Sequence, residues 1–135
     1  MTIVIDASVA LKWVLEEEGS DQARAVAASE IMVAPDLWLI ECSNVLTTKV
    51  RRGQITAVGS SQALDVLVSA PVRIMPTRGL IGLAHGLALE LNKSAYDCLY
   101  LAVAVSERAT MVTADAAFFR AASAVATYAP HIRML

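Results

Sequence analysis

The first fifteen residues contain the feature that most constrains the fold of this chain. Residues 2–5 are all β-branched, the run stops at Asp6, and apolar side chains fill most positions from 9 to 15. A short run of this kind is typical of a strand buried on both faces, and the apolar stretch that follows predicts a helix. Ligands of open α/β sheets bind outside the carboxyl ends of the strands. Asp6 is therefore expected at the ligand-binding edge of a parallel sheet.

Strands and helices alternate along the rest of the chain. The alternation predicts an α/β fold, with a parallel sheet between layers of helices and right-handed crossovers. The helix over 95–107 is apolar on nearly every side, which predicts a central position. We expect further strands at 31–34, 72–75 and 110–113, with an edge strand in the tail at 131–135. Further helices are expected over 21–29, 37–52, 56–68, 79–91 and 116–122. Ser20 and Asp21 would cap the first of these helices, and Asp36 would open the second.

Length and composition fit a single domain over residues 1–135. The chain has 56% hydrophobic residues, enough for an ample core, and a net charge of −2 that does not point to nucleic acid. Its mean hydropathy of +0.55 predicts more apolar surface than one core hides, and hence an oligomer or a bound partner. We find no apolar run near the roughly 18 residues of a membrane span and no signal-peptide pattern, so we expect a cytoplasmic protein.

Four carboxylates lie in apolar or small surroundings: Asp6, Glu41, Asp97 and Asp115. Three of them have a structural alternative, because Asp6 and Asp115 each precede a helix and Ser94 to Asp97 has capping-box spacing. Glu41 has none, since no base stands three or four residues away on its predicted helix. An unpaired buried carboxylate would cost several kcal/mol or take up a proton. Glu41 therefore needs a partner from elsewhere in the fold.

The four carboxylates would need a cation if the fold brought them together. Two negative charges about 4 Å apart repel by roughly 4 kcal/mol at an effective dielectric constant near 20. Oxygen ligands favour Mg²⁺ or Mn²⁺ over zinc. Such a site hydrolyses phosphodiesters with a metal-activated water. The pattern thus indicates a metal-dependent nuclease with Asp6, Glu41, Asp97 and Asp115 as metal ligands and catalytic residues.

Other polar residues have two open interpretations each. The hydroxyls of Ser8 and Thr113 either orient a ligand water or a carboxylate, or serve as ordinary cap and turn groups. Lys49, Arg51 and Arg52 form the densest basic cluster. They either complement the dipole of the predicted helix at its C-terminus or contact RNA.

Four segments in order resemble the PIN domain: residues 3–8, 37–41, 94–102 and 112–115. Each contains one of the four acids, and the resemblance spans nearly the whole chain, in the size of the VapC-type toxin ribonucleases of toxin-antitoxin pairs. The chain departs from the family pattern after Asp115, where the first basic residue is Arg120. That departure puts in doubt a substrate contact next to Asp115.

The resemblance implies a three-layer α/β/α sandwich and an endoribonuclease. It implies that Asp6, Glu41, Asp97 and Asp115 bind Mg²⁺ or Mn²⁺ and cleave single-stranded or loop regions of RNA. It further implies a homodimer and a cognate antitoxin protein, held against the helices of the first half, whose tail blocks the site.

Three other classes of function fit the sequence less well. A non-catalytic PIN-like module that binds RNA or protein is the alternative, although an unneutralised carboxylate cluster does not help to bind an anionic strand. A receiver domain needs an acidic pair after the first strand and a lysine after the last, and an Asp-x-Asp phosphatase needs a second acid beside Asp6. Neither pattern is present.

Overall fold

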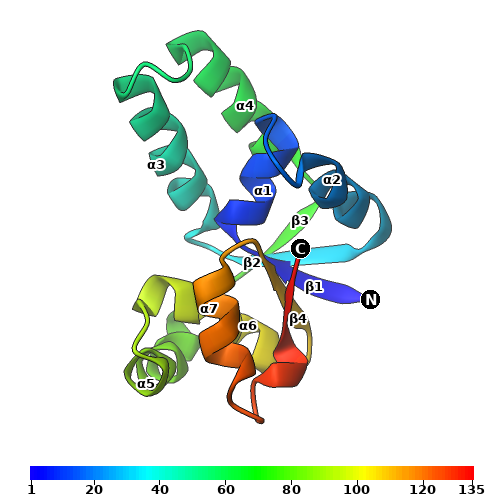
Figure 1. The fold of residues 1–135 in the computed structure, drawn as a ribbon, viewed down its shortest axis with the longest axis vertical. Coiled ribbons are helices and arrows are strands. Elements are labelled where there is room, and N and C mark those ends of the chain that lie inside the picture. Colours follow the sequence, from blue (N-terminus) through cyan, green and yellow to red (C-terminus); the bar gives the residue numbers. More distant parts are fainter.

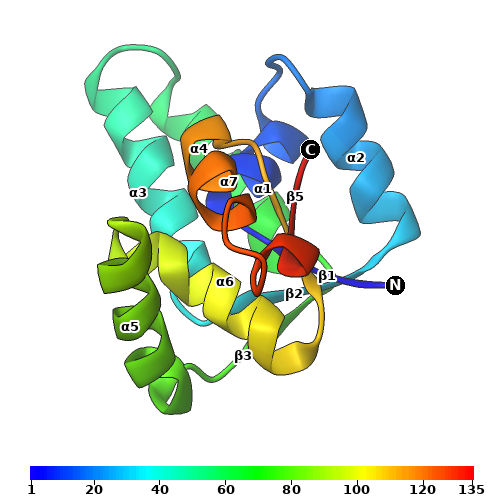
Figure 2. The same ribbon diagram turned by 60° about the horizontal axis from the view of Figure 1, so that its bottom comes forward.

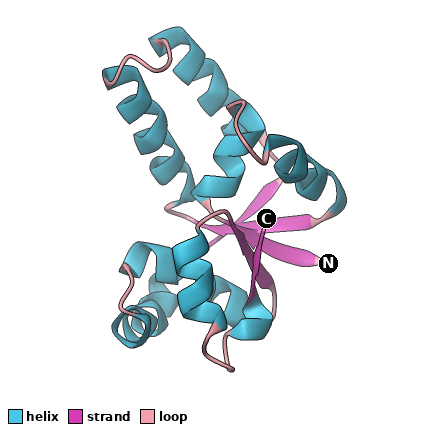
Figure 3. Cartoon of the chain, in the orientation of Figure 1, coloured by secondary structure: helices cyan, strands magenta, loops and turns pink.

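Five parallel strands form the centre of the structure, a computed structural model that describes residues 1–135 (Figure 3). The strand order is β3-β2-β1-β4-β5, and every neighbouring pair is parallel. The order places the first strand in the middle, as expected for a run buried on both faces. The strands are β1 (Thr2–Ile5), β2 (Ile31–Pro35), β3 (Val72–Met75), β4 (Thr110–Thr113) and β5 (Ile132–Met134).

Helices cover both faces of the sheet, which confirms the predicted three-layer α/β/α sandwich. Figure 1 shows α1 to α4 on one side of the strands and α5 to α7 on the other, and α3 and α4 project together from the sheet as a pair. The helices are α1 (Ala7–Val14), α2 (Ser20–Ser29), α3 (Trp38–Arg51), α4 (Ala57–Ser69), α5 (Ile81–Leu91), α6 (Ala95–Glu107) and α7 (Ala116–Ser123), with short 3₁₀ turns at Arg78–Leu80 and Ala129–His131.

The core is built from the central strands and from α6, which lies across the sheet in Figure 2. The β1 residues Ile3–Ile5 are fully buried, and so are seven consecutive residues of α6, Cys98–Ala104. Helix α6 packs on β1, β2 and β4, which confirms its predicted central position. Trp13 and Trp38 pack edge to face, with ring centroids 6.4 Å apart, and join α1 to α3. No helix combines the length and the apolarity that crossing a membrane requires.

Two predicted helix caps are wrong. Helix α2 is preceded by Gly19 in the left-handed region (φ +87°), and Ser20 is already helical, with a hydroxyl that bonds to the backbone of the preceding turn. Helix α3 has Leu37 at the cap position, and the Asp36 carboxylate instead accepts a hydrogen bond from Thr77 (2.8 Å). In both cases a tertiary or turn contact competes with the local cap.

The strand register determines which loops meet at the carboxyl edge of the sheet. Ile5 on β1 pairs with Val112 on β4. The next residues, Asp6 just after β1 and Thr113 at the end of β4, therefore lie side by side at this edge. Helices α1 and α7 begin directly after these strands, so their first turns lie at the same edge.

Candidate functional site

Asp6 is the most constrained acid of the chain. It is the N-cap of α1, and its residue is only 8% exposed. Its Oδ1 accepts hydrogen bonds from the Ser8 hydroxyl (2.6 Å) and the Val9 amide (3.0 Å), and its Oδ2 accepts one from the Thr113 hydroxyl (2.6 Å). Both oxygens are thereby fixed in direction. Of the interpretations left open for Ser8 and Thr113, the structure shows the one in which they orient a carboxylate.

Ser8 and Thr113 also connect the two loops at the sheet edge. The Ser8 hydroxyl accepts a hydrogen bond from the Ala114 amide (3.1 Å), and the Thr113 hydroxyl accepts one from the Asp115 amide (3.1 Å). Each hydroxyl therefore donates to Asp6 while it accepts from the β4–α7 loop. The resulting network ties the start of α1 to the start of α7.

Glu41 has a hydrogen-bond partner from another helix, as its sequence surroundings predict. It lies half-buried on α3, and its Oε2 accepts a hydrogen bond from the Tyr100 hydroxyl on α6 (2.7 Å). Tyr100 is 1% exposed. The partner is neutral, so it satisfies one oxygen of Glu41 and leaves the negative charge uncompensated.

Asp97 and Asp115 are held more loosely. The Asp97 amide donates to the Ser94 hydroxyl (3.1 Å), which confirms the predicted cap, while the Asp97 carboxylate has no hydrogen bond or ion pair within the protein. Asp115 is exposed, and its Oδ1 accepts a hydrogen bond from the Phe118 amide (3.0 Å), so it caps α7 as its position allowed. The carboxylate of Asp97 is thus free to rotate, whereas that of Asp115 is used by its helix.

Charge repulsion couples three of the four acids. Burial raises the pKa of Asp6, in spite of its three hydrogen bonds, and the charge of Asp97 raises this pKa further. Burial also raises the pKa of Glu41; the Tyr100 hydrogen bond opposes this, and the charges of Asp97 and Asp6 add to it. Asp115 does not contribute to either shift. No ion pair of the structure involves any of these four residues.

The charges of Asp6, Glu41 and Asp97 therefore act on one another, whereas Asp115 lies at the exposed margin of the site. No three acidic, histidine or cysteine side chains converge closely enough to form a complete metal-binding set. The donors nevertheless suit a hard cation, because all are carboxylate oxygens and no protein cation neutralises them. Mg²⁺ requires only one or two direct carboxylates, since it keeps several of its waters.

Tyr100 is the site residue to which the sequence assigned no role. It lies three positions after Asp97, on the same face of α6. Two signals in the sequence point to it: a buried tyrosine hydroxyl usually needs a partner, and Glu41 lacked one. They identify a donor and an acceptor, but only the tertiary structure pairs them.

The basic cluster of Lys49, Arg51 and Arg52 lies at the C-terminal end of α3, with Lys49 about 12 Å along the helix from Glu41. Arg51 donates to the Thr48 hydroxyl (2.9 Å), and none of the three forms an ion pair. Positive charges at the C-terminal end of a helix interact favourably with its dipole. A contact between this cluster and RNA stays a prediction.

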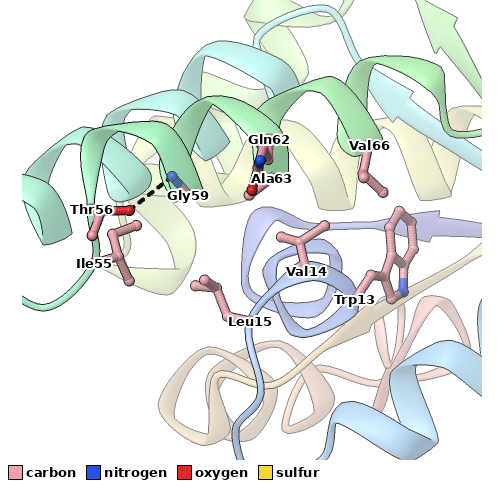
Figure 4. Close-up of a pocket in the computed structure, with 9 residues that line it drawn as sticks. All are labelled: Trp13, Val14, Leu15, Ile55, Thr56, Gly59, Gln62, Ala63 and Val66. Atoms are coloured by element: carbon pink, nitrogen blue, oxygen red, sulfur yellow. Dashed lines mark hydrogen bonds between the residues drawn. The ribbon is translucent and has the colours of Figure 1, made fainter.

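A hollow lies between α1 and α4, and none of the four acids lines it (Figure 4). Six of the nine residues that line it are hydrophobic, and none is charged. They are Trp13, Val14, Leu15, Ile55, Thr56, Gly59, Gln62, Ala63 and Val66. We call this hollow the α1–α4 groove.

The fold and the acidic site define the class of protein to which this chain belongs. It is a parallel α/β/α domain with a group of carboxylates at the carboxyl edge of its sheet. The PIN domain family matches residues 3–124. Ribonuclease VapC9 of Mycobacterium tuberculosis (strain ATCC 25618 / H37Rv) is 33% identical over 113 residues, which cover 84% of this chain and 85% of the relative. Ribonuclease VapC3 of Pyrobaculum aerophilum is 30% identical over 118 residues, with 85% and 90% covered. The chain therefore belongs to the PIN-domain family and, within it, to the VapC ribonucleases.

Solved structures agree on the fold. A crystal structure of a Pyrobaculum aerophilum protein has a TM-score of 0.73 at 21% identity, covering 90% of this chain and 79% of that one. VapBC2 of Rickettsia felis, solved with a DNA fragment from its promoter, has a TM-score of 0.66 at 17% identity, with 100% and 98% covered. The resemblance found in the sequence is thus confirmed by family, relatives and fold.

Proposed function

We propose that this protein is a metal-dependent endoribonuclease and the toxin of a toxin-antitoxin pair. The observation that carries the proposal is the group of Asp6, Glu41 and Asp97: the charge of Asp97 raises the pKa of both Asp6 and Glu41, and no protein cation forms an ion pair with any of the three. Its membership of the VapC ribonucleases supports RNA as the substrate. A binding module would gain nothing from such a cluster, because negative charge repels an RNA backbone.

In this proposal Asp6, Glu41 and Asp97 hold Mg²⁺ or Mn²⁺, and Asp115 approaches from the margin. The cation supplies a Lewis acid, which acidifies a water and offsets the charge of the phosphodiester. Asp6 acts as the fixed point of the site, because three donors set the direction of its carboxylate. Asp97 is the adjustable ligand, because its carboxylate has no partner in the protein.

The RNA strand would approach from the side of α3 and α6. A shallow depression lies beside Glu41 and is lined by Ile40, Glu41, Ser43, Asn44, Thr47 and Tyr96. Its hydroxyl and amide groups can bond to bases and sugars, and the exposed ring of Tyr96 offers a stacking surface. Asp6 is buried, whereas Glu41 and Asp97 are partly exposed, so a phosphate would reach these two carboxylates first.

We place the cognate antitoxin on the first half of the chain, with an apolar segment in the α1–α4 groove (Figure 4). Similar solved structures include a toxin-antitoxin complex from Klebsiella pneumoniae, with a TM-score of 0.55 at 17% identity over 84% of this chain and 86% of that one. Exposed apolar side chains of α5, namely Ile81, Leu83 and Leu89, suit the predicted homodimer. The homodimer and the cytoplasmic location stay predictions.

The test is cleavage of a structured RNA pool by antitoxin-free protein in Mg²⁺, Mn²⁺ or EDTA. Asp97→Asn should abolish cleavage, whereas Asp65→Asn, at an exposed acid of α4, should leave it unchanged. Discrete products that require the metal and Asp97 support the enzyme. If folded wild-type protein binds the pool but cleaves no RNA in either metal, the proposal is wrong and the binding module takes its place.

A further inference from the structure

Tyr100 is an isolated polar group inside the most buried stretch of the molecule. Its neighbours in Cys98–Ala104 are otherwise apolar or small, and all seven residues are buried. Its hydroxyl reaches out of this core at the level of the acidic site and donates to Glu41 Oε2 over 2.7 Å. The two residues are 59 positions apart, so the bond joins α6 to α3 directly beside the carboxylates.

We propose that Tyr100 is a positioning residue, which holds the Glu41 carboxylate in the orientation that binds a divalent cation beside Asp6 and Asp97. This inference rests on the function proposed above, because it concerns the same cation site. It assigns Tyr100 no contact with the metal or with RNA.

Burial of the ring makes Tyr100 a stable anchor. A glutamate side chain has three rotatable torsions, and a half-exposed one samples several rotamers unless something holds it. The Tyr100 ring is packed in the core, so the position of its hydroxyl is set by core packing rather than by the mobile surface. The hydrogen bond therefore restricts Glu41 to rotamers in which its carboxylate reaches a hydroxyl held by the core.

The donor to Glu41 is a neutral hydroxyl, and this is compatible with a bound cation. A lysine or arginine at this place would satisfy Glu41 but would neutralise it and compete with a bound cation. The tyrosine hydroxyl gives one hydrogen bond to Oε2 and leaves Oε1 without a protein partner. Asp97 lies one turn earlier on the same face of α6. One helix thus supplies a cation ligand and, through Tyr100, orients a second one from α3.

A purely structural role is the competing explanation, since a buried tyrosine hydroxyl needs an acceptor in any protein. The two roles differ in what the hydroxyl does for Glu41. If Glu41 only serves to satisfy Tyr100, loss of the hydroxyl leaves cation binding unchanged. If Tyr100 orients Glu41, loss of the hydroxyl weakens cation binding and does so only when Glu41 is present.

The experiment measures Mn²⁺ affinity by titration calorimetry for wild-type protein and for Tyr100→Phe, which keeps the ring and hence the core packing. We expect Tyr100→Phe to weaken Mn²⁺ binding about tenfold, the lower end of the loss seen when a group that orients a metal ligand is removed. The matched control is Tyr128→Phe, which deletes an equivalent hydroxyl that donates to Glu90 on the surface (2.6 Å) and should leave Mn²⁺ binding unchanged.

A double-mutant cycle separates positioning from a general loss of structure. Glu41→Gln should weaken Mn²⁺ binding, and adding Tyr100→Phe to it should cause no further loss, because the tyrosine acts through that carboxylate. Unchanged affinity in Tyr100→Phe, or losses that simply multiply in the double variant, would overturn the inference and leave the cation site intact. Failure of the wild-type protein itself to bind Mn²⁺ would instead overturn the proposed function.

Discussion

Replacing Asp6 with asparagine should stabilise the metal-free protein while it abolishes RNA cleavage. Asp6 is 8% exposed, and the net effect of its surroundings is to raise its pKa, so the fold disfavours its negative charge. Asparagine removes the charge, keeps the shape and is an equally good N-cap. Its oxygen can still accept from Ser8 and Val9, and its amide can donate to the second lone pair of the Thr113 hydroxyl, whose own hydrogen then loses the acceptor that Asp6 Oδ2 provides.

The magnitude follows from two opposing effects. Burial and the charge of Asp97 both disfavour the ionised form of Asp6, and two unit charges about 7 Å apart would repel by about 2 kcal/mol at an effective dielectric constant near 20. Hydrogen bonds to a carboxylate are stronger than those to an amide, and the Thr113 hydroxyl loses its acceptor, so much of this gain is offset. We expect a net stabilisation of about 1 kcal/mol, within the range found when functional groups are replaced for stability. In a domain of this size that raises Tm by roughly 3–5 °C.

The assay is thermal unfolding in EDTA at pH 7.5, with RNA cleavage in Mn²⁺ measured on the same preparations. Asp65→Asn is the control, because it removes an exposed acid on α4 and should change Tm very little. A fall in Tm for Asp6→Asn would show that the charge of Asp6 does not destabilise the metal-free protein. Retained cleavage would show that Asp6 is not a metal ligand. Either result refutes the reasoning.

Three further predictions concern pH, the Asp6 network and the groove. Between their ordinary pKa values of 3.8 and 4.5 and their raised ones, Asp6 and Glu41 bind more protons in the folded than in the unfolded state. Metal-free stability, measured by urea unfolding, should therefore rise as pH is lowered from neutral through the raised pKa values towards the ordinary ones, and a flat profile would contradict the raised pKa values. Thr113→Val should cost about 1–3 kcal/mol by leaving Asp6 Oδ2 without its donor, more than Thr77→Val, whose hydroxyl bonds to an exposed acid. Val66→Asp should weaken antitoxin binding in a pull-down and leave RNA cleavage intact; equal antitoxin capture would exclude the α1–α4 groove.

The elements of the fold could be predicted because their signals are local. Short runs rich in β-branched residues, such as 2–5 and 110–113, became central strands, and the apolar stretch of α6 became the helix that crosses the sheet. The caps at Ser20 and Asp36 were wrong for the opposite reason. Their side chains bond to a turn and to Thr77, and local spacing does not encode such partners.

The acidic site was only partly predictable. Asp6 and Thr113 meet because Asp6 directly follows β1 and Thr113 ends the neighbouring strand β4, an arrangement that the alternation of strands and helices already indicates. The bond between Glu41 and Tyr100 depends on how α3 crosses α6, and no periodicity within either helix specifies it. Asp115 lies at the exposed margin because capping α7 fixes its carboxylate there.

The most direct test of the carboxylate site is a crystal soaked in Mn²⁺, with the ion located by its anomalous scattering. We predict a peak between Asp6, Glu41 and Asp97 in wild-type crystals, and no peak there in Asp97→Asn crystals treated in the same way. A wild-type crystal with Mn²⁺ bound only elsewhere, or with no Mn²⁺ at a saturating concentration, would contradict a metal-dependent mechanism at these carboxylates.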